Sequence, residues 1–312
     1  SLLFQRLFFF VLYSMGAQSA KPDERGGYCG EKCRACSEYD AETPEASRLG
    51  GKEHVPVVGG RFIYPEAEDD DDDVDENGGR YRGPLQNGKR HGQGVLTRAD
   101  GSVYEGAFAE GVAHGFGVFK STTGEIYEGQ WLNDRAHGRG KHSDTQGNTY
   151  EGEWKNDRRD GKGIESWSDG AHYEGQYVQG TKHGEANYAS GKGDLYNGQF
   201  RFDKMDGEGC YKFADSRIFM GQWKQGRISG KGRMEWPNGN RYEGEFERDL
   251  KHGAGCFTWA DGRAYDGQWV NGKQHGTAEL ISPEGERSKG EWREGKPLET
   301  TDAACSTGGT QA

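Results

Sequence analysis

The amino-acid sequence predicts an all-β protein, built as an elongated single-layer solenoid of stacked antiparallel β-hairpins. Three observations predict this fold. A segment of the type Tyr-Glu-Gly-Gln-Trp recurs every 23 residues from Tyr81 onward without an insertion. Aromatic and polar residues alternate with period two inside each copy, and glycine returns at fixed places. A fixed period of this length is typical of repeat proteins, in which each copy is one small unit that stacks on its neighbours.

The first half of each copy reads as a half-buried strand. We number positions from the aromatic residue that opens the copy, which is Tyr or Phe in nine full copies, and Ser288 opens an incomplete tenth. Position 3 is always Gly, and position 5 is aromatic in every copy except the first, which has Leu85. This alternation places the aromatic residues on one face of a strand. The residues at position 1 are Tyr81, Tyr104, Tyr127, Tyr150, Tyr173, Tyr196, Phe219, Tyr242 and Tyr265.

The second half of each copy reads as a second strand, with Gly at position 12, mostly Gly at position 14, and mostly apolar residues at position 16. A turn such as Ala260-Asp261-Gly262 leads to the next copy. A three-residue loop with a left-handed Gly places position 16 opposite the next position 1, whereas a two-residue turn would place them on opposite faces. The pattern therefore predicts the three-residue loop, with rings packed on the paired glycines. The connection inside a copy, such as Asn87–Gly92, is predicted as a joining segment.

Composition and charge limit the possible functions. With 31% hydrophobic residues and 53 glycines in 312 residues, the chain cannot bury a conventional thick core. The net charge is −11, and an acidic run at Asp69–Asp73 precedes the repeats. The repeats themselves mix both signs of charge, whereas phosphate contacts need a basic stripe. We therefore expect no nucleic-acid partner.

The chain divides into four predicted segments. Residues 1–14 form an apolar leader, either the core of a secretory signal or sequence upstream of a start at Met15. Residues 15–80 are predicted to be a disordered linker that contains cysteines and acidic residues. Residues 81–298 form the array of nine repeats and a partial tenth, and residues 299–312 a disordered tail.

The linker holds the candidate lipidation residues. Glycine directly after Met15 has the placement that N-myristoylation requires, and a second acyl chain on cysteine would be needed for stable anchoring. The same cysteines have zinc-like spacing if His54 supplied a fourth ligand, or they are free thiols. The lipidation candidates are Gly16, Cys29, Cys33 and Cys36.

The repeat columns resemble the MORN repeat (membrane occupation and recognition nexus) from Tyr81 to about Trp292. The family's loop histidine is missing at Asp160, Asp206 and Ser229. The resemblance implies a non-enzymatic scaffold for protein–protein assembly in the cytoplasm, at the cytoskeleton, at a cilium or peripherally at a membrane. It leaves open a phospholipid- or phosphoinositide-binding membrane tether, or an accessory array split from a phosphatidylinositol phosphate kinase-like protein. We expect no catalytic residue, cofactor or metal site.

Two sets of side chains are candidates for binding. The position-5 rings are expected to bind a partner protein, with packing inside the array as the alternative; these are Phe108, Trp131, Trp154, Tyr177, Trp223, Phe246 and Trp269. A row of basic residues at positions 9 and 10 is either a lipid-facing edge or a mixed-charge rim, because acids at position 2 lie near it. The most basic repeat provides the candidate anionic-lipid residues Lys224, Arg227, Lys231, Arg233 and Arg241.

Histidine recurs at position 11 in six copies. Successive copies should lie ~10 Å apart, two strand spacings, so neighbouring imidazoles cannot share an ion. We expect these histidines to be loop residues that fix the backbone through a ring nitrogen. Cys210 and Cys256, two copies apart at roughly 19 Å, are expected not to form a disulfide with each other, which favours a reducing compartment.

Overall fold

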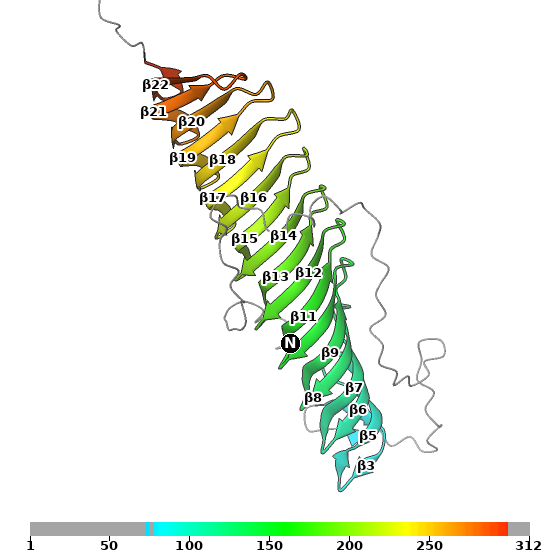
Figure 1. Ribbon diagram of the computed structural model, residues 1–312. Coiled ribbons are helices and arrows are strands. Elements are labelled where there is room, and N and C mark those ends of the chain that lie inside the picture. Colours follow the sequence, from blue (N-terminus) through cyan, green and yellow to red (C-terminus); the bar gives the residue numbers. More distant parts are fainter. Residues whose placement is uncertain (1–72, 75–77, 299–312) are drawn as a thin grey trace, which may run out of the picture. The chain divides into compact units, whose positions relative to one another are not determined.

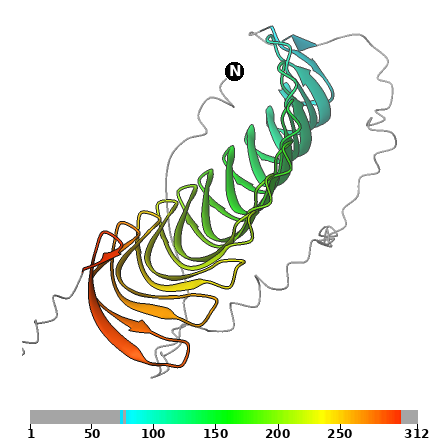
Figure 2. The ribbon, with the colours of Figure 1, turned by 90° about the horizontal axis from the view of Figure 1, so that it is seen from above.

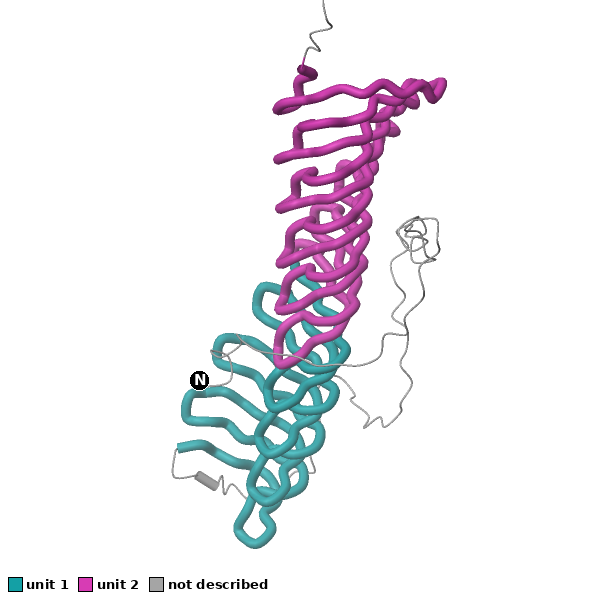
Figure 3. Tube along the Cα trace, turned by 60° about the vertical axis from the view of Figure 1, so that its left-hand side comes forward, with its two compact units in different colours: residues 1–8, 13–168 teal, residues 9–12, 169–312 magenta. Residues whose placement is uncertain are grey.

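The computed structural model describes residues 73–74 and 78–298, and every regular element in these ranges is a β-strand. Contacts divide the chain into two compact units, and the boundary falls between Ser168 and Asp169 (Figure 3). Within each unit, strands that follow one another in the chain pair antiparallel (Figure 1), except that β2 pairs with β5 and the intervening β3 and β4 form a small sheet of their own. The predicted all-β stack of hairpins is confirmed. The described residues contain no helix that could span a membrane.

Several predicted features lie outside the described residues. These are the apolar leader, most of the linker, the tail and the candidate lipidation residues Gly16, Cys29, Cys33 and Cys36.

The strands of the unit that ends at Ser168 are β1 (Asp73–Val74), β2 (Arg80–Arg82), β3 (Leu85–Gln86), β4 (Lys89–Arg90), β5 (Gly92–Thr97), β6 (Val103–Ala109), β7 (Val112–Lys120), β8 (Ile126–Leu132), β9 (Arg135–Ser143), β10 (Thr149–Lys155) and β11 (Arg158–Ser166). Those of the unit that begins at Asp169 are β12 (His172–Val178), β13 (Thr181–Ala189), β14 (Leu195–Arg201), β15 (Lys204–Lys212), β16 (Ile218–Lys224), β17 (Arg227–Glu235), β18 (Arg241–Glu247), β19 (Leu250–Thr258), β20 (Ala264–Val270), β21 (Lys273–Ile281), β22 (Arg287–Arg293) and β23 (Lys296–Pro297). Figure 2 shows that the strands bend along their length.

The predicted three-residue loop between copies is confirmed. Where β9 leads into β10, Tyr150 lies opposite His142 and Gly152 lies opposite Gly140. The loop ends on Gly147, whose φ of 87° is in the left-handed region that glycine tolerates. The register therefore keeps position 16 and the next position 1 on the same face of the sheet.

The expected joining segment inside each copy is instead a tight hairpin turn. Between β8 and β9, Asn133 and Asp134 have φ of 51° and 62°, so two residues with positive φ form a turn that suits the twist of the flanking strands. Positions 9–12 then continue the second strand instead of forming a loop. Gly138, at position 12, has φ of 63° where the pairing with β8 shifts at a bulge. Even in the expected segment Asn87–Gly92 only the first two residues form the turn.

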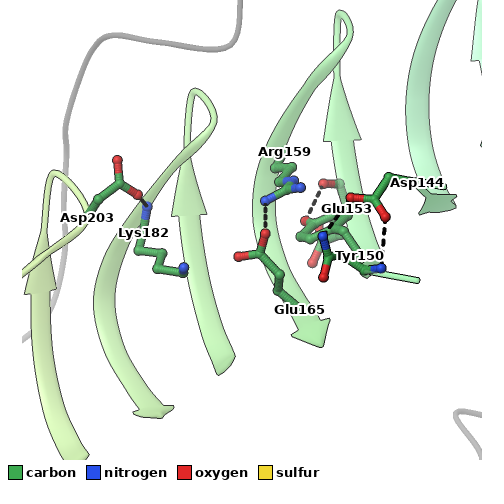
Figure 4. Close-up of polar contacts among 8 residues, drawn as sticks. Asp144, Tyr150, Glu153, Arg159, Glu165, Lys182 and Asp203 are labelled. Atoms are coloured by element: carbon green, nitrogen blue, oxygen red, sulfur yellow. Dashed lines mark hydrogen bonds and ion pairs between the residues drawn. The ribbon is translucent and has the colours of Figure 1, made fainter. Parts of the chain in front are cut away.

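The ring face, which we define as the sheet face bearing positions 1, 5, 10, 14 and 16, is built by tyrosines that lie on glycines. A Cβ added at Gly140 would stand 2.3 Å from the Tyr127 hydroxyl oxygen, so only glycine leaves room for the ring. The Tyr127 hydroxyl donates a hydrogen bond to the Gln130 carbonyl at 3.0 Å. The same position 1 to position 4 bond recurs at 3.0 Å in the copy that begins at Tyr150, where it joins the Tyr150 hydroxyl to the Glu153 carbonyl (Figure 4). The opposite surface, the polar face, carries positions 2, 4, 13 and 15.

The two end copies depart from the pattern. Asp73–Val74, which the sequence analysis assigned to the disordered linker, forms β1 and pairs with β2, so the linker boundary at residue 80 is wrong. This strand covers backbone groups of β2 that would otherwise form an open sheet edge. At the far end of the other unit, Ser288 lies opposite Leu280 without a ring to cover it, and Leu280 is 38% exposed.

Candidate functional site

The position-5 rings are not accessible, so that premise of the partner-binding prediction is wrong. Trp269 stands edge-on between Tyr242 and Tyr265, with ring centroids 5.3 and 5.2 Å away, and its Nε1 donates to the Gly255 carbonyl at 2.8 Å. Because the ring face has no covering layer in the array, its own rings cover one another. The exposed fractions are 4% for Phe108, 3% for Trp131, 8% for Trp154, 2% for Tyr177, 7% for Trp223, 6% for Phe246 and 5% for Trp269.

A second row of rings is accessible on the ring face of the unit that begins at Asp169. These rings occupy positions 16 and 18, at the ends of β15, β17 and β19 and just beyond them, and each is half-buried. Neighbouring centroids lie 4.5 Å apart for Tyr211 and Phe213, 5.7 Å for Trp236 and Phe257, and 5.0 Å for Phe257 and Trp259. We call these five residues the aromatic strip.

Sequence reasoning missed the aromatic strip. It placed position 16 on the apolar face opposite the next position 1, and it made no prediction for position 18. The signal that could have found the strip is the clustering of large rings at these two positions from Tyr211 to Trp259.

A lysine lies among the rings of the strip. Lys251 on β19 places its ammonium 4.2 Å from the ring centroid of Trp269, 4.6 Å from Phe257, 5.5 Å from Tyr242 and 5.8 Å from Trp236. Burial among these rings lowers the pKa of Lys251 to about 8, because desolvation disfavours the charged form. We call this arrangement the lysine pocket.

Cations on the loops beside the strip are compensated. Arg217 lies 4.4 Å from the ring centroid of Phe213 and forms an ion pair with Asp215 at 2.8 Å. Arg263 repeats this arrangement over Trp259, again paired with a carboxylate two residues earlier in the chain. These arginines therefore bring stacking surface but little free charge.

In the unit that ends at Ser168, one of the cations at position 10, Arg159, is also compensated (Figure 4). Arg159 lies 4.6 Å from the Tyr150 ring centroid and pairs with Glu165, at position 16, at 2.5 Å. Glu165 is only 8% exposed. Burial, together with the charge of Arg159, lowers the pKa of His142 below its usual range.

The predicted row of basic residues splits between surfaces. Its position-10 members lie over position-1 rings; they are Arg90, Arg159, Lys182 and Lys251. Their bulging strand turns them to the ring face and not to an edge. The backbone N–H of Lys182 also donates a hydrogen bond to the Asp203 carboxylate at 2.8 Å (Figure 4).

The candidate anionic-lipid residues do not form one patch either. Lys224 and Arg227 face each other across the hairpin turn between β16 and β17. Lys231 and Arg233 lie on the polar face of β17, and Arg233 is ion-paired within its own strand. Arg241 starts β18 at the other end of the hairpin, beside the three-residue loop. Their positive charge is therefore dispersed over three places.

The position-11 histidines lie mostly in strands, contrary to the expected loop position. Only His275 accepts a described backbone hydrogen bond through a ring nitrogen, from the Glu294 N–H to Nδ1 at 3.5 Å. Nδ1 is buried without a hydrogen-bond partner in His91, His137, His183 and His252. Among residues 73–74 and 78–298, no group of three or more His, Cys, Asp or Glu side chains could hold a metal ion.

Comparison with curated proteins found no match. Several solved structures align at low similarity. The TCP10 domain of Danio rerio CPAP, in complex with a peptide of Danio rerio STIL, is 13% identical over 72% of this chain and 99% of its own, with a TM-score of 0.41. The TCP10c domain of Drosophila melanogaster Sas-4 is 12% identical over 65% and 93%, with a TM-score of 0.25. We draw no functional conclusion from similarities at this level.

Nine consecutive segments of the chain match the MORN repeat family, at the same starting residues as the nine full copies. They are residues 81–103, 104–126, 127–149, 150–172, 173–195, 196–216, 219–241, 242–262 and 265–287. The matched segments make up more than half of the chain, and their hairpins, paired glycines and position-1 rings are those described above. The chain belongs to the MORN repeat family.

Proposed function

We propose that the protein is a non-enzymatic scaffold that binds other proteins through the aromatic strip. The observation that carries the proposal is a row of half-buried rings at the ends of β15, β17 and β19 and on the residues that directly follow these strands. Large rings held on rigid elements are favourable anchors, since they bring much apolar surface to a contact and lose little conformational freedom. We place the scaffold in the cytoplasm, peripheral to a membrane or to the cytoskeleton.

The non-enzymatic part of the proposal rests on the sequence, whose repeats contain no catalytic motif. We expect the purified chain to leave phosphatidylinositol phosphates unchanged in a turnover assay. Turnover that a point mutation in this chain abolishes would contradict the proposal.

The lipid-binding alternative is less favoured, because the candidate headgroup residues are dispersed over three places. Exposed and dispersed charges each contribute only ~0–1 kcal/mol and weaken with salt. Sedimentation with vesicles that contain phosphatidylserine tests this alternative directly.

The binding proposal is tested by selecting peptides from a display library on the full chain and measuring their affinity. The variant Trp236→Ala/Trp259→Ala removes two anchors of the strip and should weaken binding at least tenfold. Phe116→Ala is the matched control, because Phe116 is a 48% exposed ring on the polar face. Equal binding by wild type and the double variant, with circular dichroism unchanged, would refute the strip as the docking face.

A further inference from the structure

The lysine pocket holds a cation without a counter-ion. Lys251 forms no ion pair or hydrogen bond with any described residue, in contrast to the two arginines stacked on the strip. Its four nearest aromatic rings belong to Trp236, Tyr242, Phe257 and Trp269. Burial among these rings lowers its pKa, because the charged ammonium is partly removed from water.

A half-buried cation in this setting favours an incoming anion. Contacts with ring faces offset part of the cost of removing an ammonium from water, but they leave its N–H donors without acceptors. A carboxylate brought to the pocket would accept from these donors in a place where water is partly excluded. Electrostatic attraction is stronger there than on an open surface.

We propose that the aromatic strip docks a partner peptide segment in which an aspartate or glutamate is flanked by apolar or aromatic residues, and that this carboxylate pairs with Lys251. The inference rests on the proposed function, since it adds the chemistry of the partner to the same face. The flanking residues are required because the strip also contains Tyr211, Phe213 and Trp259, which add apolar surface outside the pocket. Charge complementarity is what distinguishes this partner from a purely apolar one.

The experiment is a double-mutant cycle on the full chain. Peptides of nine residues, randomised at every position including the central one, are selected by display. The best binder that depends on the strip is then measured against wild type and Lys251→Met, each with the acidic residue of the peptide intact or changed to its amide. Each single change should weaken binding about tenfold or more, and both together little more than either one, because the two groups act as one pair.

Controls separate the possible outcomes. Lys251→Met replaces a half-buried cation by an apolar side chain of similar length, so it should fold, as circular dichroism checks. Lys204→Met, at the exposed first residue of β15 in the same unit, should leave binding unchanged. Strip-dependent binders that lack an acidic residue, additive losses in the cycle, or no strip-dependent binder at all would each overturn the inference. Capture by phosphatidylserine vesicles that Lys251→Met abolishes would overturn it in favour of a lipid phosphate.

Failure of the inference can be told from failure of the proposed function. Binders that lose affinity in Trp236→Ala/Trp259→Ala but not in Lys251→Met support the docking face. They contradict only the pairing of a peptide carboxylate with Lys251. Binders that tolerate both variants refute the docking face itself.

Discussion

Two repeats of this protein place a cation at the same position, position 10, and surround it differently. In the repeat that begins at Tyr150, Arg159 at position 10 is neutralised by Glu165 at position 16. In the repeat that begins at Tyr242, Lys251 at position 10 faces Phe257 at position 16, and no described carboxylate pairs with it. The backbone pattern is the same in both. The difference teaches that position 16 decides whether the ring face is electrostatically closed or open to an anion.

The comparison also separates structural positions from variable ones. Positions 1, 3, 5 and 14 build the sheet, since their rings and glycines pack into one another and are buried. Positions 10, 16 and 18 lie over that layer and differ between copies. Binding chemistry should therefore be sought in the second set.

The largest expected effect comes from breaking the ion pair between Arg159 and Glu165. Glu165→Leu leaves the guanidinium of Arg159 without its carboxylate in a largely buried place, which should lower the free energy of unfolding by about 3 kcal/mol. Denaturant unfolding followed by fluorescence measures this loss. Adding Arg159→Met should restore most of it, because both charges are then gone. Glu151→Ala on the exposed polar face is the control and should cost below about 1 kcal/mol. Equal losses in Glu165→Leu and Glu151→Ala would show that the pair is not buried in solution.

An intermediate effect follows from the titration of Lys251, which makes the stability of the fold depend on pH. The folded-state pKa of Lys251 is about 8, below the unfolded value of 10.5, so between these values the unfolded chain binds more protons. Stability should therefore rise as pH increases from 8, by up to about 2 kcal/mol at pH 9.5. Below pH 8 the full cost of burying the charge remains.

The control for this pH dependence is Lys251→Met. It should be more stable than wild type at pH 7, and the difference should shrink as pH approaches 9.5. Measurements stop there because buried tyrosines such as Tyr242 have a raised folded-state pKa, so their contribution to stability is lost above pH 10. A constant difference between the two proteins from pH 7 to 9.5 would show that Lys251 is solvated and that the pocket is not formed.

The smallest expected effect concerns position 1, where two copies again differ. Tyr150→Phe removes the hydroxyl that donates to the Glu153 carbonyl, and should cost about 1 kcal/mol. Phe219 is the one position-1 residue among the nine without this hydroxyl, so Phe219→Tyr should add stability of the same order by binding the Gln222 carbonyl. Thermal unfolding of the two variants checks both signs. A loss in Phe219→Tyr would mean that the copy at Phe219 is too tightly packed to admit the oxygen.

Much of the fold could be predicted from the sequence, because the 23-residue period and the alternation fix both strands and their shared face. The glycines at positions 3 and 14 pointed to rings lying on backbone, as Tyr127 does over Gly140. The hairpin turn at positions 7 and 8 was missed, since residues such as Asn133 and Asp134 adopt positive φ without a glycine.

The site could not be predicted in the same way. Alternation shows which face a ring occupies but not whether neighbouring rings cover it, so Trp131 and Trp154 looked available and are buried. The lysine pocket combines residues of three consecutive copies, with Trp236, Lys251 and Trp269 widely spaced in the chain. Only the stacking of hairpins brings them together.

The bulge at position 12 constrains how such a gene can change. Each second strand accommodates its extra residues there, on a glycine such as Gly138 with positive φ, and so keeps its apolar side chains on the ring face. Deleting one codon downstream of the bulge would turn the rest of that strand over and expose its apolar residues. Losing or duplicating a whole 23-codon copy leaves every face unchanged. Natural variation in this array should therefore accumulate as changes in copy number, and small insertions or deletions within a copy should be purged.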